Sequence, residues 1–273
     1  MSDNPEIGRQ ILVNGIATNV HDLGAGPPVL LIHGSGPGVS AWANWRLTLP
    51  ALTAAGLRCI APDMMGFGYT DPPADGRYSM AGWVDHLHGL VQALELERFA
   101  LIGNSFGGAL ALAYAIRYPD AVGKLVLMGA AGLEFPLTDG LDRVWGYEAS
   151  LENMRGLLEV FAFDTRFVND DLAELRHRAT IRPGVMERFS AMFPAPRQEG
   201  IRMLASEPEA IAGISVPALV VHGRDDRVIP VANAYRFLEL LPDAELHVFG
   251  QCGHWTQIEK AARFNALVAD FLS

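Results

Sequence analysis

One stretch decides the fold: Leu101-Ile102-Gly103-Asn104-Ser105-Phe106-Gly107-Gly108-Ala109. The apolar residues from 99 to 102 predict a short buried strand, and the alanine- and leucine-rich run from 109 predicts a buried helix. Between them, Ser105 stands in a G-x-S-x-G turn, which is typical of a serine nucleophile held out above the edge of a sheet. Side chains at 103 and 107 would collide in so tight a turn, so glycine is expected at both. The N-terminus of the helix favours negative charge beside the serine.

The composition predicts a substantial core and no attraction to anionic partners. The chain has 273 residues, 50% of them hydrophobic, which suits one large α/β domain with an insertion. Its net charge of -10 argues against nucleic acid and anionic membrane surfaces as partners, so a small anionic substrate would need a local arginine. No apolar run could span a bilayer and no signal peptide is recognisable, so a cytoplasmic location is expected. Cys59 and Cys252 are expected to be free thiols.

Short apolar runs alternate with helical patterns along most of the chain. Strands are predicted at residues 10–13, 16–21, 29–32, 57–61, 99–102, 124–128, 218–221 and 245–249, and helices at 42–52, 79–94, 109–116, 231–241 and near the end of the chain. Asn14-Gly15 between the first two strands predicts a hairpin turn. Strands that alternate with helices predict an α/β fold with a mostly parallel, doubly wound sheet.

The alternation of apolar strands and helical patterns stops between residues 134 and 210. Apolar strands stop there, and short helical patterns are broken at Pro183-Gly184 and at Pro194-Ala195-Pro196. We therefore expect a helical cap at 134–210, inserted into a core formed by residues 1–133 and 211–273.

A serine needs a base to act as a nucleophile, and the base needs an acid that orients it. His254 lies in a Gly-rich loop after the last predicted strand, at the strand end where ligands gather in such sheets, whereas His247 lies inside that strand. We therefore predict His254 as the base. For the acid, the loop after the preceding strand offers Asp225 and Asp226, and Glu134 is a minor alternative.

The negative oxygen formed when a serine attacks a carbonyl group needs two backbone donors. The N–H of Phe106 follows from the turn itself, and the second donor is expected in the loop 34–38, where we choose the N–H of Ser35. Because the donor is a backbone group, we expect that the kind of side chain at position 35 does not matter to the donor.

One arginine of the predicted cap is expected to face a cavity. A helix over 171–179 would place four residues on one apolar face, namely Leu172, Leu175, Arg176 and Ala179. There Arg176 could grip a carboxylate bidentately. Arg178, four residues after Glu174, is expected to form an ordinary exposed ion pair.

No metal or organic cofactor is expected. His86 and His88 lie two residues apart on a predicted helix, so they point away from each other and make a poor metal pair. The glycine-containing run 64–68 lacks the spacing and the lysine of a phosphate-binding loop.

At this point the sequence resembles a known family, the meta-cleavage product hydrolases of bacterial aromatic degradation, which are C–C bond hydrolases with the α/β-hydrolase fold. The resemblance covers nearly the whole chain and rests on His33 to Gly38 with Trp42 and Asn44, Gly103 to Gly108, Arg176 with Ile181 to Gly184, Gly223 to Arg227, and Gly253-His254-Trp255. The cap run and the stretch 192–197 are most similar to the branch that acts on 2-hydroxymuconate semialdehyde.

The resemblance implies a reaction and a set of roles. Such enzymes add water across the C5–C6 bond of a 2-hydroxy-6-oxo-hexa-2,4-dienoate, after the dienol has become a ketone by protonation at C5, and release 2-hydroxypenta-2,4-dienoate and a carboxylic acid. The triad would be Ser105, His254 and Asp226. Arg176 would hold the substrate carboxylate, and the other substrate contacts would be Asn44, Asn104 and Trp255. No cofactor is needed, and relatives form dimers or larger assemblies, so a homo-oligomer is expected.

Two questions stay open at the level of sequence. An ordinary carboxylesterase on the same triad would turn over neutral short esters and would depend little on Arg176, and a non-catalytic binding protein of this fold would have no activity to lose. The C6 substituent (hydrogen, methyl, larger alkyl or phenyl) would depend on the pocket that we expect around Ala130, Ala131, Phe135, Ile201 and Val228.

Overall fold

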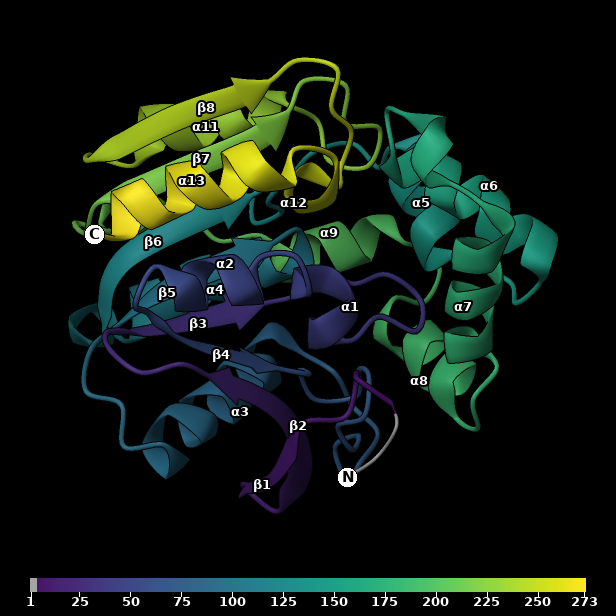
Figure 1. The fold of residues 1–273 in the computed structure, drawn as a ribbon, viewed down its shortest axis with the longest axis horizontal. Helices are drawn as coiled ribbons and strands as arrows, with labels where there is room; N and C mark the ends of the chain where they lie inside the picture. The colour runs from purple at the N-terminus through teal and green to yellow at the C-terminus, as the bar shows by residue number, and fades with distance from the viewer. Residues whose placement is uncertain (1–3) are drawn as a thin grey trace.

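The computed structural model describes residues 4–273, and its centre is one twisted sheet (Figure 1). Within this range eight strands follow the order β1-β2-β4-β3-β5-β6-β7-β8. The strands from β4 through β8 pair in parallel, and β1 and β2 run antiparallel at one edge. The predicted mostly parallel α/β sheet is therefore confirmed. The expected absence of a signal peptide concerns the start of the chain, of which residues 1–3 lie outside the described range.

The strands are β1 (Arg9–Val13), β2 (Ile16–Leu23), β3 (Pro28–Ile32), β4 (Arg58–Pro62), β5 (Phe99–Asn104), β6 (Val122–Met128), β7 (Ala218–Gly223) and β8 (Ala244–Phe249). The helices of the sheet layers are α1 (Ala41–Trp45), α2 (Leu49–Ala54), α3 (Met80–Ala93), α4 (Phe106–Arg117), α10 (Pro208–Ala212), α11 (Ala232–Leu240), α12 (Thr256–Glu259) and α13 (Ala261–Leu272). Between β6 and β7 come α5 (Asp139–Trp145), α6 (Leu151–Phe161), α7 (Asp170–Thr180), α8 (Val185–Met192) and α9 (Gln198–Leu204).

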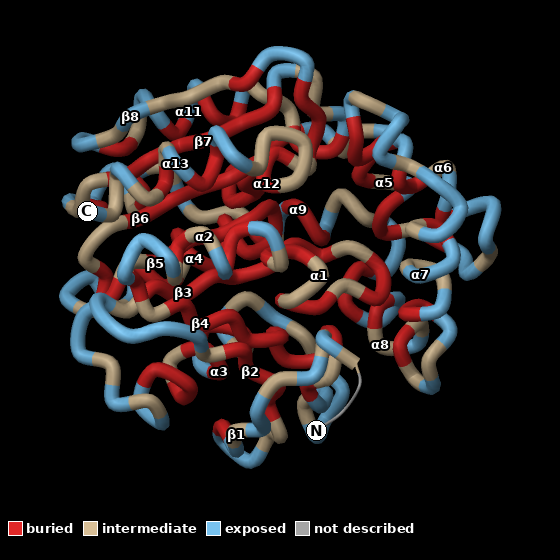
Figure 2. Tube along the Cα trace, in the orientation of Figure 1, coloured by how far each residue is buried: buried red, intermediate tan, exposed pale blue. Residues whose placement is uncertain are grey.

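The sheet is buried on both faces, which explains why its central strands are apolar throughout. Successive side chains of a strand point to opposite faces. In β3, Leu30 and Ile32 accordingly join the core beneath α3 and α4, whereas Val29 and Leu31 join the core beneath α1, α2 and α13. Figure 2 shows the same arrangement as a buried centre inside an exposed shell.

The predicted helix over 42–52 is wrong in one respect. The structure has two short helices there, α1 and α2, separated at residues 46–48. Pro50 stands in the first turn of α2 and has no N–H to donate to the carbonyl of Arg46, so one continuous helix would lack this bond. Ser40 caps α1 by accepting a hydrogen bond from the N–H of Ala43 at 3.1 Å.

The helices α5 to α8 gather beyond the carboxyl ends of the strands, at the right of Figure 1. Arg182, just after α7, donates to the carbonyl of Gly68 at 3.1 Å and stacks over the ring of Tyr69, so this part of the chain rests on the loop after β4. Cys59 and Cys252 are free and buried, as expected. In the part of the chain that is described, no helix has the length and apolar character needed to cross a membrane.

Candidate active site

Ser105 sits at the turn between β5 and α4 in a strained backbone conformation, with φ 55° and ψ -114°. A Cβ atom at Gly103 would lie 2.2 Å from the carbonyl oxygen of Gly107, and a Cβ atom at Gly107 would lie 2.3 Å from that of Ile32. A side chain at either position would therefore collide with the backbone, as expected from the sequence. Only glycine allows the strand and the helix to approach closely enough to hold the serine in this turn.

His254 is paired with Asp226. Its Nδ1 lies 2.7 Å from Asp226 Oδ2, while Asp226 Oδ1 accepts from the N–H groups of Val228 at 2.8 Å and Ile229 at 3.0 Å. The two backbone donors fix the carboxylate in its plane. An Nδ1–H on His254 directed at this carboxylate leaves Nε2 as the basic nitrogen.

The two other acid candidates lie elsewhere. Asp225 accepts from the N–H of Cys252 at 3.3 Å, and Glu134 pairs with Arg202 at 3.0 Å on the exposed surface. Of the three carboxylates offered by the sequence, the structure therefore brings Asp226 to His254.

A second histidine, which sequence reasoning missed, also contacts this carboxylate. His222 Nε2 lies 3.3 Å from Asp226 Oδ2 and 3.0 Å from the carbonyl oxygen of Ile229, and the side chains of His222 and Asp226 are almost fully buried. Burial raises the pKa of Asp226, but the charges and hydrogen bonds of His254 and His222 outweigh it, so the pKa lies well below its usual range. Asp226 is therefore a carboxylate at neutral pH. The only sequence signal for His222 was its place at the end of the preceding strand.

Ser105 and His254 line the same cavity, but no hydrogen bond joins them within residues 4–273. Bonds of this kind are often long in the absence of substrate and tighten in the complex. The Ser105 hydroxyl is consequently unengaged and open to a bound substrate.

The two predicted oxyanion donors are also unengaged. Phe106 is the first residue of α4, so its N–H has no partner within the helix, and neither it nor the N–H of Ser35 donates to another described residue. Gly34 N–H donates to Asn44 Oδ1 at 3.3 Å, which steadies the loop that carries Ser35. Because both N–H groups remain free, they are available to a negative oxygen.

His33, which precedes that loop, is a further buried histidine beside the site. Burial lowers its pKa to about 4, so it is neutral at pH 7. Its Nε2 accepts from Met64 N–H at 2.9 Å, and its Nδ1 lies 2.7 Å from the carbonyl oxygen of Gly34. A neutral ring satisfies both hydrogen bonds. It joins residues 34–38, here called the oxyanion loop because they carry a proposed oxyanion donor, to the loop after β4.

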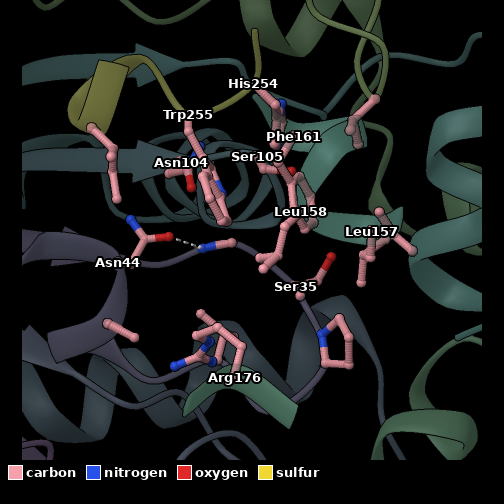
Figure 3. Close-up of a pocket in the computed structure, with 18 of the residues that line it drawn as sticks. Ser35, Asn44, Asn104, Ser105, Leu157, Leu158, Phe161, Arg176, His254 and Trp255 are labelled. Atoms are coloured by element: carbon pink, nitrogen blue, oxygen red, sulfur yellow. Dashed lines mark hydrogen bonds between the residues drawn. The ribbon is translucent and has the colours of Figure 1, made fainter. Parts of the chain in front are cut away.

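Arg176 faces the cavity from α7, opposite Ser105 and His254 (Figure 3). Its Nη2 donates to the carbonyl of Gly38 at 2.6 Å, and its Nη1 lies 3.4 Å from Glu6 Oε1. Burial lowers the pKa of Arg176 and Glu6 raises it, but the guanidinium remains a cation at neutral pH. Its remaining N–H groups make no bond within the described residues and can face a substrate carboxylate.

The predicted apolar face of α7 is partly wrong. Leu175 is 49% exposed, whereas Leu172 and Arg176 are half-buried and Ala179 is buried, so Leu175 lies at the edge of this face. Residues at these three positions lie within about 60° of one another around a helix, at roughly 100° per residue, and Leu175 lies outside that arc. The ion pair expected between Glu174 and Arg178 is not formed among the described residues, although both side chains are exposed.

The other predicted contacts line the same cavity. Asn104 Nδ2 donates to the carbonyl of Met128 at 3.2 Å, and Trp255 stacks on Phe161 with ring centroids 5.1 Å apart. Asn44 Nδ2 is buried without a partner among the described residues. An unpaired buried donor is costly, so a ligand that accepts from Asn44 would gain affinity.

Most of the positions expected around the C6 substituent do not line this cavity. Of the five positions named above, only Val228 lines the cavity, and the other four are buried in the main core. The apolar wall is formed instead by Leu141, Val144, Met154, Leu157, Leu158 and Phe161. This difference arises because the wall comes from α5 and α6, whose placement over the site cannot be inferred from local patterns.

The loop that carries His254 is tied to the end of α6. His254 N–H donates to the carbonyl of Phe161 at 2.8 Å. Glu259 accepts from Gly253 N–H at 2.7 Å and from the N–H groups of Phe163 at 2.9 Å and Asp164 at 3.0 Å. One carboxylate therefore joins the loop of His254 to the segment that follows α6. Among residues 4–273, no group of three His, Cys, Asp or Glu side chains is placed to hold a metal ion.

Comparison with known proteins finds relatives that match nearly the whole chain. Residues 27–261 match the family model described as alpha/beta hydrolase fold. The chain is 58% identical over 271 residues to the 2-hydroxymuconate semialdehyde hydrolase of Pseudomonas sp. strain CF600, covering 99% of this chain and 95% of the relative. It is 56% identical over 270 residues to the 2-hydroxy-6-oxo-2,4-heptadienoate hydrolase of Pseudomonas putida F1, covering 99% and 98%. A solved structure with a TM-score of 0.97, 56% identity and 98% coverage of both chains is a serine-to-alanine variant of the meta-cleavage product hydrolase from Pseudomonas fluorescens IP01, complexed with acetates.

Proposed function

Because the chain belongs to the α/β-hydrolase fold family and, within it, to the meta-cleavage product hydrolases, we propose that it cleaves the C5–C6 bond of 2-hydroxy-6-oxo-hexa-2,4-dienoates such as 2-hydroxymuconate semialdehyde or its 6-alkyl analogues. The products are 2-hydroxypenta-2,4-dienoate and a carboxylic acid. One observation carries the proposal: a single cavity is lined by Ser105 and His254 on one side and by the cationic Arg176 on the other. A neutral ester would not need that arginine.

Binding places the substrate between these two ends. Arg176 holds the carboxylate, Asn44 supports the polar end through its free amide group, and Asn104 and Trp255 lie beside the dienoate. The C6 carbonyl then lies at Ser105, where the unengaged N–H groups of Phe106 and Ser35 can receive its oxygen. The residues that line the cavity support this pose.

Carbon is a poor leaving group, so the dienol must first become a ketone. His254 carries the proton that C5 receives, while the 2-hydroxyl group gives up its own proton. Ser105 Oγ then attacks C6, with His254 as base, and the N–H groups of Phe106 and Ser35 stabilise the resulting negative oxygen. When the C5–C6 bond breaks, its electron pair moves through the conjugated system onto the 2-oxo group, whose oxygen takes up the proton that His254 removed from Ser105 and so becomes the 2-hydroxyl group of the product. Water releases the acid from Ser105.

We further propose that residues 134–210 form the cap of the site over a core of residues 1–133 and 211–273. The helices α6 and α7 supply Phe161 and Arg176 to the cavity, which supports this division. The enzyme would work in the cytoplasm as a homo-oligomer. Two free, buried cysteines fit a reducing compartment, and light scattering would give the mass of the assembly.

The decisive test follows the yellow ring-fission dienolate. The dienolates made from catechol and 3-methylcatechol should both lose their visible absorbance and yield 2-hydroxypenta-2,4-dienoate when the protein is added, and the ratio of the two rates of product formation gives the C6 preference. A nitrophenyl ester serves as the comparison substrate. If the colour persists while the ester is cleaved, the enzyme is the carboxylesterase instead.

The substitution Arg176→Ala should lower kcat/KM for the dienolate and spare the neutral ester. Loss of one partner of a buried charge pair costs roughly 2–5 kcal/mol, which is about 30- to 4,000-fold in rate. Arg178→Ala, an exposed residue of the same helix, is the matched control and should stay within about two-fold of the wild type. Equal losses for the dienolate and the ester in Arg176→Ala would contradict a role in carboxylate binding.

A further inference from the structure

The loop that carries the proposed oxyanion donor is anchored by a residue of the cap. Trp145 is the last residue of α5, and its Nε1–H donates to Ser35 Oγ at 3.0 Å. Both residues are buried, with exposed fractions of 4% and 5%. The side chain of Ser35 therefore has a hydrogen-bond partner of its own. This differs from the expectation that the kind of side chain at position 35 does not matter to the donor.

The indole is held so that it cannot easily leave this bond. Its ring stacks on Phe193, with centroids 4.4 Å apart and planes within 1° of parallel. On α9, a Cβ atom at Gly200 would lie 2.9 Å from the ring, so this helix packs its backbone directly against the indole. A donor fixed in this way can fix its acceptor.

The N-terminal end of α5 contacts the loop after β7 that carries Asp226, here called the acid loop. Thr138 Oγ1 donates to the carbonyl of Val228 at 2.8 Å, two residues after Asp226. A Cβ atom at Gly140 would lie 2.0 Å from the carbonyl oxygen of Arg227. The helix α5 therefore reaches from the acid loop at its first turn to the oxyanion loop at its last residue.

The oxyanion loop needs such an anchor because three glycines lie among residues 34–38. Within residues 4–273, the other side chains that hydrogen-bond to this loop are Asn44, His33 and Arg176, which contact Gly34 and Gly38. Among the residues that the structure describes, Trp145 is the one that hydrogen-bonds to Ser35 itself.

We propose that Trp145 is a positioning residue for the hydrolytic half of the reaction, because its hydrogen bond to the Ser35 hydroxyl holds the Ser35 N–H where the C6 oxygen becomes negative. The inference rests on the proposed function. It makes a step-specific prediction: the negative oxygen forms only when C6 is attacked, so protonation at C5 does not need this donor.

The test is single-turnover stopped-flow kinetics of Trp145→Phe, which removes the N–H and keeps an aromatic ring against Phe193. Loss of the dienolate band reports ketonisation and should keep its wild-type rate. The appearance of 2-hydroxypenta-2,4-dienoate should slow by about 10-fold, which is less than the roughly 100- to 1,000-fold seen when an oxyanion donor is removed altogether. Ser35→Ala keeps its backbone N–H and should show the same split.

The double variant Trp145→Phe with Ser35→Ala should be no slower than either single variant, because both substitutions remove the same hydrogen bond. Tyr147→Phe is the matched control, since it removes a buried hydroxyl from the same segment, where it contacts Ser150 and Thr180 rather than the oxyanion loop. It should leave both phases unchanged.

Three results would overturn the inference: equal slowing of both phases, additive losses in the double variant, or a changed preference between the two dienolates at unchanged rates, which would mean that the indole only shapes the pocket. A wild-type protein that leaves the dienolate intact would remove the proposed function together with this inference. An active wild type with unaffected variants would remove the inference alone.

Discussion

Replacing Ser105 with alanine should lower the rate of carbon–carbon bond cleavage by about 10,000-fold or more, the scale on which a serine triad fails without its nucleophile. The substitution should not harm the fold. The Ser105 hydroxyl makes no hydrogen bond within residues 4–273, so its removal leaves no partner unsatisfied. Alanine keeps the Cβ atom, so the strain of the turn is unchanged. The loss would therefore belong to the chemistry.

The measurement is product release from the dienolate, with the midpoint of thermal unfolding as the control. His254, Asp226 and Arg176 remain in place in Ser105→Ala, so the dienolate should still bind and change its absorbance while little product appears. Cleavage at more than about one-hundredth of the wild-type rate would contradict covalent catalysis by the serine, because it would mean that His254 activates water directly.

The parts of the fold that the sequence predicted well are those set by local signals. The apolar run from residue 99, the two glycines of the turn and the alanine-rich run after it each demand their structure within a few residues, and β5 and α4 are found there. The hairpin at Asn14-Gly15 is of the same kind. One local rule was overlooked, since Pro50 splits the predicted helix over 42–52.

The contacts that sequence reasoning missed join residues far apart in the chain. Trp145 meets Ser35 across 110 residues, and Glu6 meets Arg176 across 170. No pattern along one segment encodes such pairs, because they depend on how the cap helices lie over the sheet. The same reason explains why the sequence did not point to the residues of α5 and α6 that form the apolar wall of the cavity.

The substitution Asp226→Asn should lower kcat by about 1,000- to 10,000-fold, by the mechanism known from serine triads whose acid is made an amide. The reason lies in the two backbone N–H groups, of Val228 and Ile229, that donate to Oδ1. They require the amide oxygen of the asparagine at that position, so the NH₂ group must face His254. Nδ1 of His254 then becomes an acceptor, its proton moves to Nε2, and the ring can no longer take a proton from Ser105.

Asp225→Asn is the control that gives this prediction its discriminating power. Asp225 is the neighbouring aspartate in the same loop, but it contacts the N–H of Cys252 and the side chain of Arg224 rather than His254. Its amide variant should stay within about five-fold of the wild type, since loss of an exposed ion pair is worth at most about 1 kcal/mol. If steady-state kinetics gave the large loss to Asp225→Asn and the small one to Asp226→Asn, the acid would be Asp225, and the loop would have to rearrange when substrate binds. A large loss in both would instead mean that the loop as a whole, and not one carboxylate, orients the base.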